Sequence, residues 1–368
     1  MADTDLSDDI TLLALMLRDS KRQNSLYRPG PYWSDKSNVA AAEIKRCGLS
    51  DFRGKRNMIG SSYADNLLVD RRLDLTGTIK NRIARVLLQI YPFKKLFDSQ
   101  VRWTETFAQE AIRHASEIVG VSPRAKDILR AYKLPANTLR GGCLMKARTA
   151  DSEVSIHYLK LLDQHDRIAS RIDFHRARSV FEVGGGFGAN IHILLENYKN
   201  IRKVLYLDIP PNLYVGTQYL KSFYGDAVRD YRDLKDRQRV CFADDNALEI
   251  LCIAPWQIEE FSGDVDIFVN SHSFVEMPRA VAQNYADKLM ALPGSKNCAI
   301  AFATYGGFDL STTLHPSSLP SFIPGREFEY FEAEKFLDAP EMNYFYISPG
   351  KLAHREQARR SPSQPQPC

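Results

Sequence analysis

The chain has 368 residues, of which 44% are hydrophobic and 26% are charged. This composition is typical of a globular protein with a sizeable core, and the length allows about two domains. The formal net charge of +4 is too small to indicate a nucleic-acid-binding surface, which needs a concentrated basic patch. The six cysteines form no Cys-x-x-Cys pair, so they indicate neither a zinc site nor a redox motif.

The first residues bear on targeting. Residues 1–9 carry acidic side chains, whereas a signal peptide begins with basic ones. The apolar run Ile10–Leu17 is shorter than the roughly 20 residues that a membrane-spanning helix needs. We therefore expect a cytoplasmic protein without stable membrane insertion.

The first 170 residues predict a mostly helical region. Apolar side chains recur there at helical spacing, with little sign of a parallel sheet. The expected helices lie near residues 9–19, 37–46, 75–92, 100–119, 123–133 and 152–170.

From Ser179 onward, short apolar strands alternate with helices. The expected strands are Val180–Val183, Val204–Leu207, Arg239–Phe242, Val265–Asn270 and Cys298–Thr304, with two closing strands at Glu327–Tyr330 and Asn343–Ile347. The expected helices between them lie near residues 189–197, 212–224, 246–251 and 278–292. This alternation predicts right-handed βαβ units and a mostly parallel sheet. We therefore expect an α/β protein with a Rossmann-like domain over residues 171–350, after the helical region 1–170 and before a disordered tail, 351–368.

A glycine-rich turn joins the first predicted strand to its helix. It contains Gly184, Gly185, Gly186 and Gly188. Glycines let the backbone approach a ligand closely and direct helix N-terminal amides at it. The turn also fits a loose dinucleotide fingerprint, so a nicotinamide cofactor is an alternative.

Acidic residues mark the ends of the first three predicted strands: Glu182, Asp208, and the pair Asp244 and Asp245. The carboxyl ends of parallel strands line one crevice. S-adenosylmethionine presents a cationic amino group, a ribose diol and an adenine amine, and carboxylates accept hydrogen bonds from all three. A pyrophosphate cofactor would be repelled. We expect Glu182 and the glycine turn near the amino acid portion, Asp208 on the ribose, and Asp244 or Asp245 near adenine.

The fourth predicted strand ends at Asn270 and continues into Ser271–Pro278, where the acceptor must meet the cofactor. Methyl transfer needs an in-line nucleophile, and a hydroxyl acceptor must also lose its proton, a task that suits histidine. His272 is the first candidate for a general base. Glu276 is the second, unless it orients substrate hydroxyls or caps the next helix. Asn270 is assigned to the cofactor side, and no set of residues indicates a metal ion.

Other side chains were considered for the same site. Tyr305 and His315 follow the fifth predicted strand and are weaker candidates to face the substrate. Three histidines are expected at the surface or between domains: His157, His165 and His175.

Several blocks, taken in order, resemble the sugar O-methyltransferase family. They are Tyr27–Trp33, Cys47–Arg53, Phe181–Gly188, Tyr206–Pro210 with Gln218–Leu220, and Asn270–Met277. The glycine turn alone is shared by many class I S-adenosylmethionine-dependent methyltransferases. The resemblance implies S-adenosylmethionine as methyl donor and a hydroxyl of a sugar or glycosylated small molecule as acceptor. It also implies that residues 1–170 form a substrate lid or a dimerisation element, the latter making a homo-oligomer.

Two other classes of function remain open. One is an NAD-dependent oxidoreductase, and the other is a non-catalytic binding protein that keeps the methyltransferase fold. The intact glycine turn and the acidic strand ends favour the enzyme, because a degenerate site would be expected to lose some of them.

Overall fold

The computed structural model describes residues 6–50, 52–53, 109–110, 112–143, 145–149, 152–306, 313–337 and 341–354. The helix expected near residues 75–92 and most of the tail expected over 351–368 lie outside these ranges.

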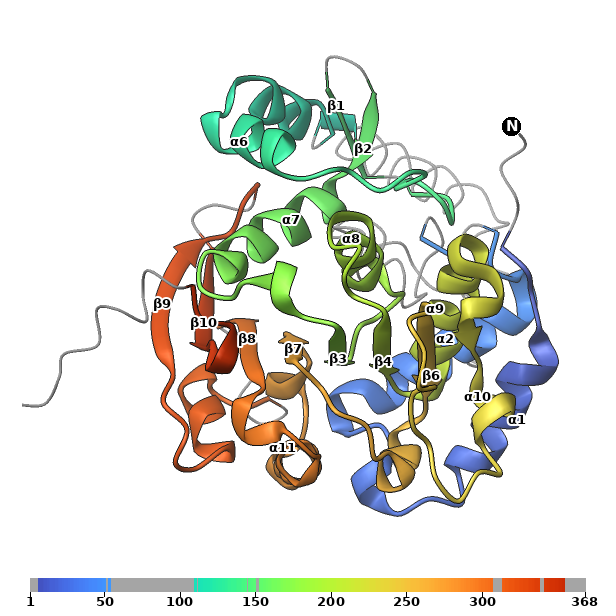
Figure 1. The fold of residues 1–368 in the computed structure, drawn as a ribbon. Coiled ribbons are helices and arrows are strands. Elements are labelled where there is room, and N and C mark those ends of the chain that lie inside the picture. Colours follow the sequence, from blue (N-terminus) through green and yellow to red (C-terminus); the bar gives the residue numbers. More distant parts are fainter. Residues whose placement is uncertain are drawn as a thin grey trace, which may run out of the picture.

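An eight-stranded sheet forms the centre of the molecule (Figure 1). Every pairing is parallel except the two made by β10, which runs antiparallel to both of its neighbours. The fold is therefore α/β with a mostly parallel, Rossmann-like sheet, as the alternation of elements predicts. In spatial order the strands are β5 (Val228–Arg229), β6 (Glu249–Ile253), β4 (Lys203–Leu207), β3 (Ser179–Val183), β7 (Ile267–Ser271), β8 (Ala299–Tyr305), β10 (Met342–Ser348) and β9 (Glu329–Glu334).

Helices cover both faces of the sheet (Figure 1). One face packs against α7 (Ile156–Ala169), α8 (Ala189–Asn197) and α9 (Pro210–Tyr224), and the other against α11 (Arg279–Ala291). Side chains of β3 alternate between the faces: Val180 joins the first cluster, whereas Phe181 joins the second. A strand buried on both sides reads as a continuous apolar run, which is why the sequence reveals β3, β4, β7 and β8.

The described part of the N-terminal region is mostly helical. It contains α1 (Ile10–Ser20), the 3-10 turn η1 (Ser25–Tyr27), α2 (Pro31–Cys47), helical residues 112–121, and α6 (Pro123–Ala131). Helix α2 begins earlier than expected, because Pro31 takes the first helical position, where its missing N–H costs nothing. The sequence analysis misses the short hairpin formed by β1 (Lys146–Arg148) and β2 (Glu153–Ser155).

The helices α1 and α2 share the core of the sheet. Leu12 and Met16 of α1 and Ile44 of α2 belong to the same hydrophobic cluster as the helices α7 to α9, and both α1 and α2 contact α9 directly. These two helices therefore do not form a core of their own.

The third strand is misplaced by the sequence analysis. Residues 239–242 form no strand, and Val240 makes only an isolated bridge with Phe261. The helix expected near 246–251 is also wrong, because β6 occupies Glu249–Ile253. Periodicity does not separate a short buried strand from a short buried helical segment, and the run Ile250–Ile253 is wholly apolar.

The glycine turn rests on a close contact between β4 and α9. The Tyr206 hydroxyl donates a hydrogen bond to the carbonyl oxygen of Gly186. Gly216 of α9 faces this pair, and a methyl group at Gly216 would overlap the Tyr206 hydroxyl. The shape of the turn therefore depends on a glycine thirty residues further along the chain.

We predict that Gly216→Ala lowers the free energy of unfolding by about 1–3 kcal/mol, the usual cost of overpacking a core. Urea denaturation measures this change. The control is Gly120→Ala in helix 112–121, where no described atom lies within 4 Å of the new methyl group. At that exposed site, the substitution should leave the free energy of unfolding unchanged or raise it by up to about 1 kcal/mol. Equal stability of Gly216→Ala and the wild type would show that the contact is not tight.

Candidate active site

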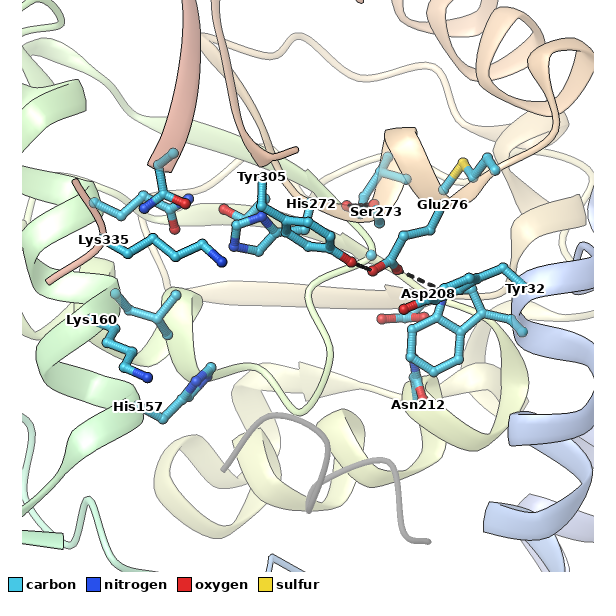
Figure 2. A pocket seen from close by; sticks show the side chains of 18 of the residues that line it. Tyr32, His157, Lys160, Asp208, Asn212, His272, Ser273, Glu276, Tyr305 and Lys335 are labelled. Atoms are coloured by element: carbon cyan, nitrogen blue, oxygen red, sulfur yellow. Dashed lines mark hydrogen bonds between the residues drawn. The ribbon is translucent and has the colours of Figure 1, made fainter. Parts of the chain in front are cut away.

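A cavity of about 1100 Å³ opens at the carboxyl ends of the central strands (Figure 2). Its wall includes Gly184 after β3, Asp208 after β4, Ser271 at the end of β7 and Tyr305 at the end of β8. The chain leaves β3 toward β4 and later returns to its other side with β7. Such a switch point is where open α/β sheets bind ligands, and the volume suffices for more than one small molecule.

The glycine turn takes a backbone shape that favours glycine. The φ angles of Gly184, Gly186 and Gly188 are +72°, +64° and +87°, in the left-handed region. A methyl group at Gly184 would also overlap the Ser273 side chain. The turn leads directly into α8, with Gly188 at its N-cap, as the sequence predicts.

Asp208 joins the glycine turn to the end of β4. Its Oδ2 accepts a hydrogen bond from the Gly186 amide at 2.8 Å, and its Oδ1 accepts one from the Ile209 amide at 2.7 Å. The side chain is buried yet lines the cavity. Burial raises the pKa of Asp208 to about 7, although the two amides favour the charged form. With about four lone-pair sites, the carboxylate can accept a further hydrogen bond from a ligand hydroxyl, which suits the predicted role on a ribose.

Glu182 lies beneath the turn. Its Oε1 accepts a hydrogen bond from Asn190 Nδ2 of α8 at 2.8 Å. Its Oε2 is buried and has no hydrogen-bond partner among the described residues. Burial raises the pKa of Glu182 to about 7. Glu182 is not part of the cavity wall, so it contacts α8 and supports the turn from behind.

Asn270 connects three backbone segments. Its Nδ2 donates to the Val183 carbonyl oxygen at 2.8 Å and to Ser273 Oγ at 2.5 Å, and its Oδ1 accepts from the Phe274 amide at 3.0 Å. These contacts hold the ends of β3 and β7 against the turn η5 (Ser273–Glu276). Asn270 therefore shapes the site, and the cavity wall does not include it.

Asp244 and Asp245 lie away from the site. Both are exposed, and Asp245 pairs with Lys203 at 2.8 Å. Lys203 begins β4, so this ion pair lies at the amino edge of the sheet, opposite Asp208. The expected contact with adenine is wrong, because it depended on the misplaced third strand. The carboxyl end of β6 is followed by Ala254 and Pro255, which are not acidic.

His272 has an unusual backbone and an unused ring nitrogen. Its φ angle is +71°, a costly value for a residue other than glycine that is often found at functional sites. Its amide donates to the Ala303 carbonyl oxygen at 2.8 Å. Its Nδ1 is buried, with no hydrogen-bond partner in the described ranges. Burial, aided by the charge of Lys335, lowers the pKa of His272 to about 3, so the ring is neutral at physiological pH.

Glu276 is held by two distant segments. Its Oε2 accepts a hydrogen bond from Trp33 Nε1 of α2 at 2.8 Å, and its Oε1 accepts one from the Tyr305 hydroxyl (Figure 2). Burial raises the pKa of Glu276. Helix α11 has no side-chain cap, so Glu276 does not serve as the helix cap that the sequence analysis left open. The Tyr305 ring also packs beside His272, with ring centroids 4.7 Å apart.

Several residues of the cavity wall escaped the sequence analysis. They are Tyr32, Trp33 and Lys36 of α2, His157 and Lys160 of α7, and Lys335 after β9. His157 was expected at the surface or between domains, yet it faces the cavity (Figure 2). His165 is buried and hydrogen-bonded to Tyr198, whereas His175 is exposed. The three-residue spacing of His157 and Lys160, which puts both on one helix face, was an available signal.

His315 lies outside the cavity wall and accepts a hydrogen bond from the Ser317 amide. Within the described ranges, no group of three or more His, Cys, Asp or Glu side chains is arranged to hold a metal ion. None of the helices described there is long and apolar enough to cross a bilayer.

No protein-family profile matches the sequence, and no curated protein does. Solved structures with a similar arrangement include the mitomycin 7-O-methyltransferase MmcR, at 11% identity and a TM-score of 0.36, covering 75% of this chain and 74% of that one. Magnesium protoporphyrin IX methyltransferase from Synechocystis PCC 6803, with bound S-adenosylmethionine, aligns at 9% identity and a TM-score of 0.33. The alignment covers 64% of this chain and 96% of that one. The S-adenosylmethionine-dependent methyltransferase SibL aligns at 15% identity and a TM-score of 0.34, covering 69% and 77%. At these values the likeness supports no conclusion about cofactor or substrate.

We predict that Asp208 makes the unliganded protein less stable as the pH rises. Its pKa is raised on folding, so the stability that the protonated form contributes is lost as the pH rises toward and through about 7. Relative to Asp208→Asn, the wild type should lose about 2 kcal/mol of unfolding free energy between about pH 5.5 and about pH 8. Denaturant titrations at several pH values measure the difference.

The exposed variant Asp244→Asn is the control for this experiment and should follow the wild type. If the difference in unfolding free energy between the wild type and Asp208→Asn stays constant across this pH range, Asp208 is charged in the unliganded protein throughout it, and the prediction is wrong.

Proposed function

We propose that this protein is an S-adenosylmethionine-dependent O-methyltransferase that acts on a hydroxyl of a sugar or glycosylated small molecule. The observation that carries the proposal is Asp208, a buried carboxyl group at the cavity wall, bonded to the amide of Gly186 in the glycine turn. It lies at the switch point of the sheet, where a ribose would present its two hydroxyls to it.

The charges around the glycine turn favour a cationic cofactor over a dinucleotide. A pyrophosphate would use the turn amides and the N-terminus of α8. Here the Gly186 amide already donates to Asp208, and Glu182 lies buried directly below the turn. Two carboxyl groups in this position would repel a pyrophosphate, whereas a sulfonium and an ammonium would be attracted.

The residues present fit S-adenosylmethionine at two places. Asp208 would hold the ribose, and the backbone of Gly184–Gly188 would lie against the amino acid portion. When bound, the cofactor supplies an electrophilic methyl group. The adenine contact stays unassigned, because the acidic pair assigned to it lies at the other edge of the sheet.

The acceptor side has a proton acceptor and an orienting carboxylate. His272 is neutral, and its Nδ1 is available to take the proton of an acceptor hydroxyl. Glu276, fixed by Trp33 and Tyr305, is placed to orient that hydroxyl. The aromatic and polar groups of this wall, together with the family resemblance, support a sugar acceptor.

The N-terminal region takes part in this site as a substrate lid. Trp33 and Lys36 of α2 form part of the cavity wall. Gly30, just before the helix, lies against Pro278, two positions after Glu276. These contacts favour the lid over the dimerisation role. In this proposal, helices α2 and α7 of the region 1–170 help to cover the acceptor, and the domain 171–350 binds the cofactor and also supplies His272 and Glu276.

The first prediction of this proposal concerns the cofactor. Calorimetric titration should show binding of S-adenosylmethionine and of its demethylated product at about micromolar Kd, a free energy of about −8 kcal/mol. NADH should not bind. Binding of NADH alone would establish an oxidoreductase, and binding of none of the three would favour a non-catalytic protein.

The second prediction concerns the base. His272→Ala should lower kcat by about 10²–10⁴-fold, the usual contribution of a general base, with an unchanged cofactor Kd. Because the pKa of His272 in the unliganded protein is about 3, its protonation should leave the wild-type kcat/KM, which reports the free enzyme, flat as the pH falls from neutral into the mildly acidic range. Glu276→Gln is the matched comparison, since its pKa is raised.

Steady-state rates with a methyl acceptor, measured across pH, separate the two residues. Near-normal turnover of His272→Ala, with a wild-type rate that falls in mild acid and a slow Glu276→Gln, would transfer the role of base to Glu276.

A further inference from the structure

Charge is distributed unevenly around the cavity. Asp208 and Glu276 lie toward one end, whereas His157, Lys160 and Lys335 gather at the other (Figure 2). We call these three residues the basic end. His272 and Tyr305 lie between the two ends (Figure 2), so the proposed transfer would take place between two carboxyl groups and two lysines. The wall also contains Lys36 near Glu276 and Glu341 beside Lys335.

The basic end is built from two separate elements. His157 and Lys160 lie one turn apart near the start of α7, and Lys335 directly follows β9. The Lys335 ammonium lies 5.2 Å from the centre of the Tyr305 ring. It also pairs at 2.5 Å with Glu341, whose side chain is 64% exposed. The Lys335 side chain itself is 21% exposed. A partly exposed ion pair stabilises little, so a ligand in the cavity can compete for this lysine.

The positive field extends behind the wall. Arg53 is fully buried, and its guanidinium donates to the carbonyl oxygens of Thr138 and Arg140 and to Ser155 Oγ, which are all neutral acceptors. Burial, together with the smaller effect of the charges of Arg53 and Lys160, lowers the pKa of His157 well below its usual value. The same two positive charges would attract an anion.

We propose that the methyl acceptor carries a negative charge, as a carboxylate or a phosphate, which Lys160 and Lys335 bind at the basic end. This inference rests on the proposed function and names the chemical class of its acceptor. A hydroxyl of the same molecule then lies between the lysines and Glu276, beside His272. A sugar acid or a sugar phosphate meets this description, whereas a neutral sugar would offer the two lysines no opposite charge.

The amino acid carboxylate of the cofactor is a second source of negative charge. The His157 ring packs 5.4 Å from that of Phe187 in the glycine turn, so the two sources meet close together. Lys335 belongs to the opposite wall, beside Tyr305 and Tyr344. A test must therefore follow cofactor affinity and acceptor affinity separately.

The experiment uses protein saturated with S-adenosylhomocysteine and titrates it calorimetrically with matched compounds: glucose, glucuronic acid and glucose 6-phosphate, and the same three forms of galactose. We expect at least one anionic compound to bind about tenfold more tightly than its neutral counterpart, as for a charge-assisted contact. The stronger of the carboxylate and the phosphate identifies the group. Lys160→Gln and Lys335→Gln should each remove most of this preference and leave the Kd of S-adenosylhomocysteine unchanged, which also shows that the variants are folded.

The matched control is Lys296→Gln, an exposed lysine that is not part of the cavity wall, and it should behave as the wild type. Equal or weaker binding of every anionic compound, or no binding by any of them, would overturn the inference. A loss of S-adenosylhomocysteine affinity in both variants would also overturn it and assign the basic end to the cofactor. Failure of the wild type to bind S-adenosylhomocysteine would instead refute the proposed function itself.

Discussion

The geometry of the cavity depends on one carboxyl group, that of Asp208, and on the hydrogen bonds that it accepts from two backbone amides. The hydrogen bond from Gly186 connects the turn after β3 to the end of β4. A buried carboxylate is costly unless donors surround it, so the turn and the acid stabilise each other. Tyr206 and Gly216 secure the same turn from the helix side. The proposed cofactor end of the site is thus made of local segments that follow two adjacent strands.

The proposed acceptor end is built differently, from segments that only folding brings together. Trp33 and Glu276 are 243 positions apart, yet share a hydrogen bond, and Tyr305 reaches the same carboxylate from β8. Lys160 and Lys335 come from α7 and from the end of β9. Different parts of the chain therefore form the proposed cofactor end and the proposed acceptor end.

This difference explains what the sequence could predict. Gly184, Asp208 and His272 each follow a buried apolar strand directly, so a local pattern locates them at the cavity wall. The predicted contact of Asp244 or Asp245 with adenine is wrong because the pattern places the third strand at 239–242 and a helix at 246–251. The structure instead has β6 at Glu249–Ile253. Trp33, Lys160 and Lys335 have no local signature of a site, because their position depends on how α2, α7 and β9 pack around the sheet.

The separation of charge in the cavity bears on the chemistry as well as on binding. Burial, with a smaller contribution from the charge of Lys335, lowers the pKa of His272 to about 3, which makes the ring a weak base near neutral pH. An anion bound to Lys335 would offset the charge of that lysine and raise the pKa of His272, whereas the larger effect of burial would remain. The same anion would lie far from the carboxylates that attract the cationic cofactor. In the proposed complex, binding of the anionic substrate would thus raise the pKa of His272, the residue that takes its proton. A neutral analogue of the same shape would bind without raising that pKa.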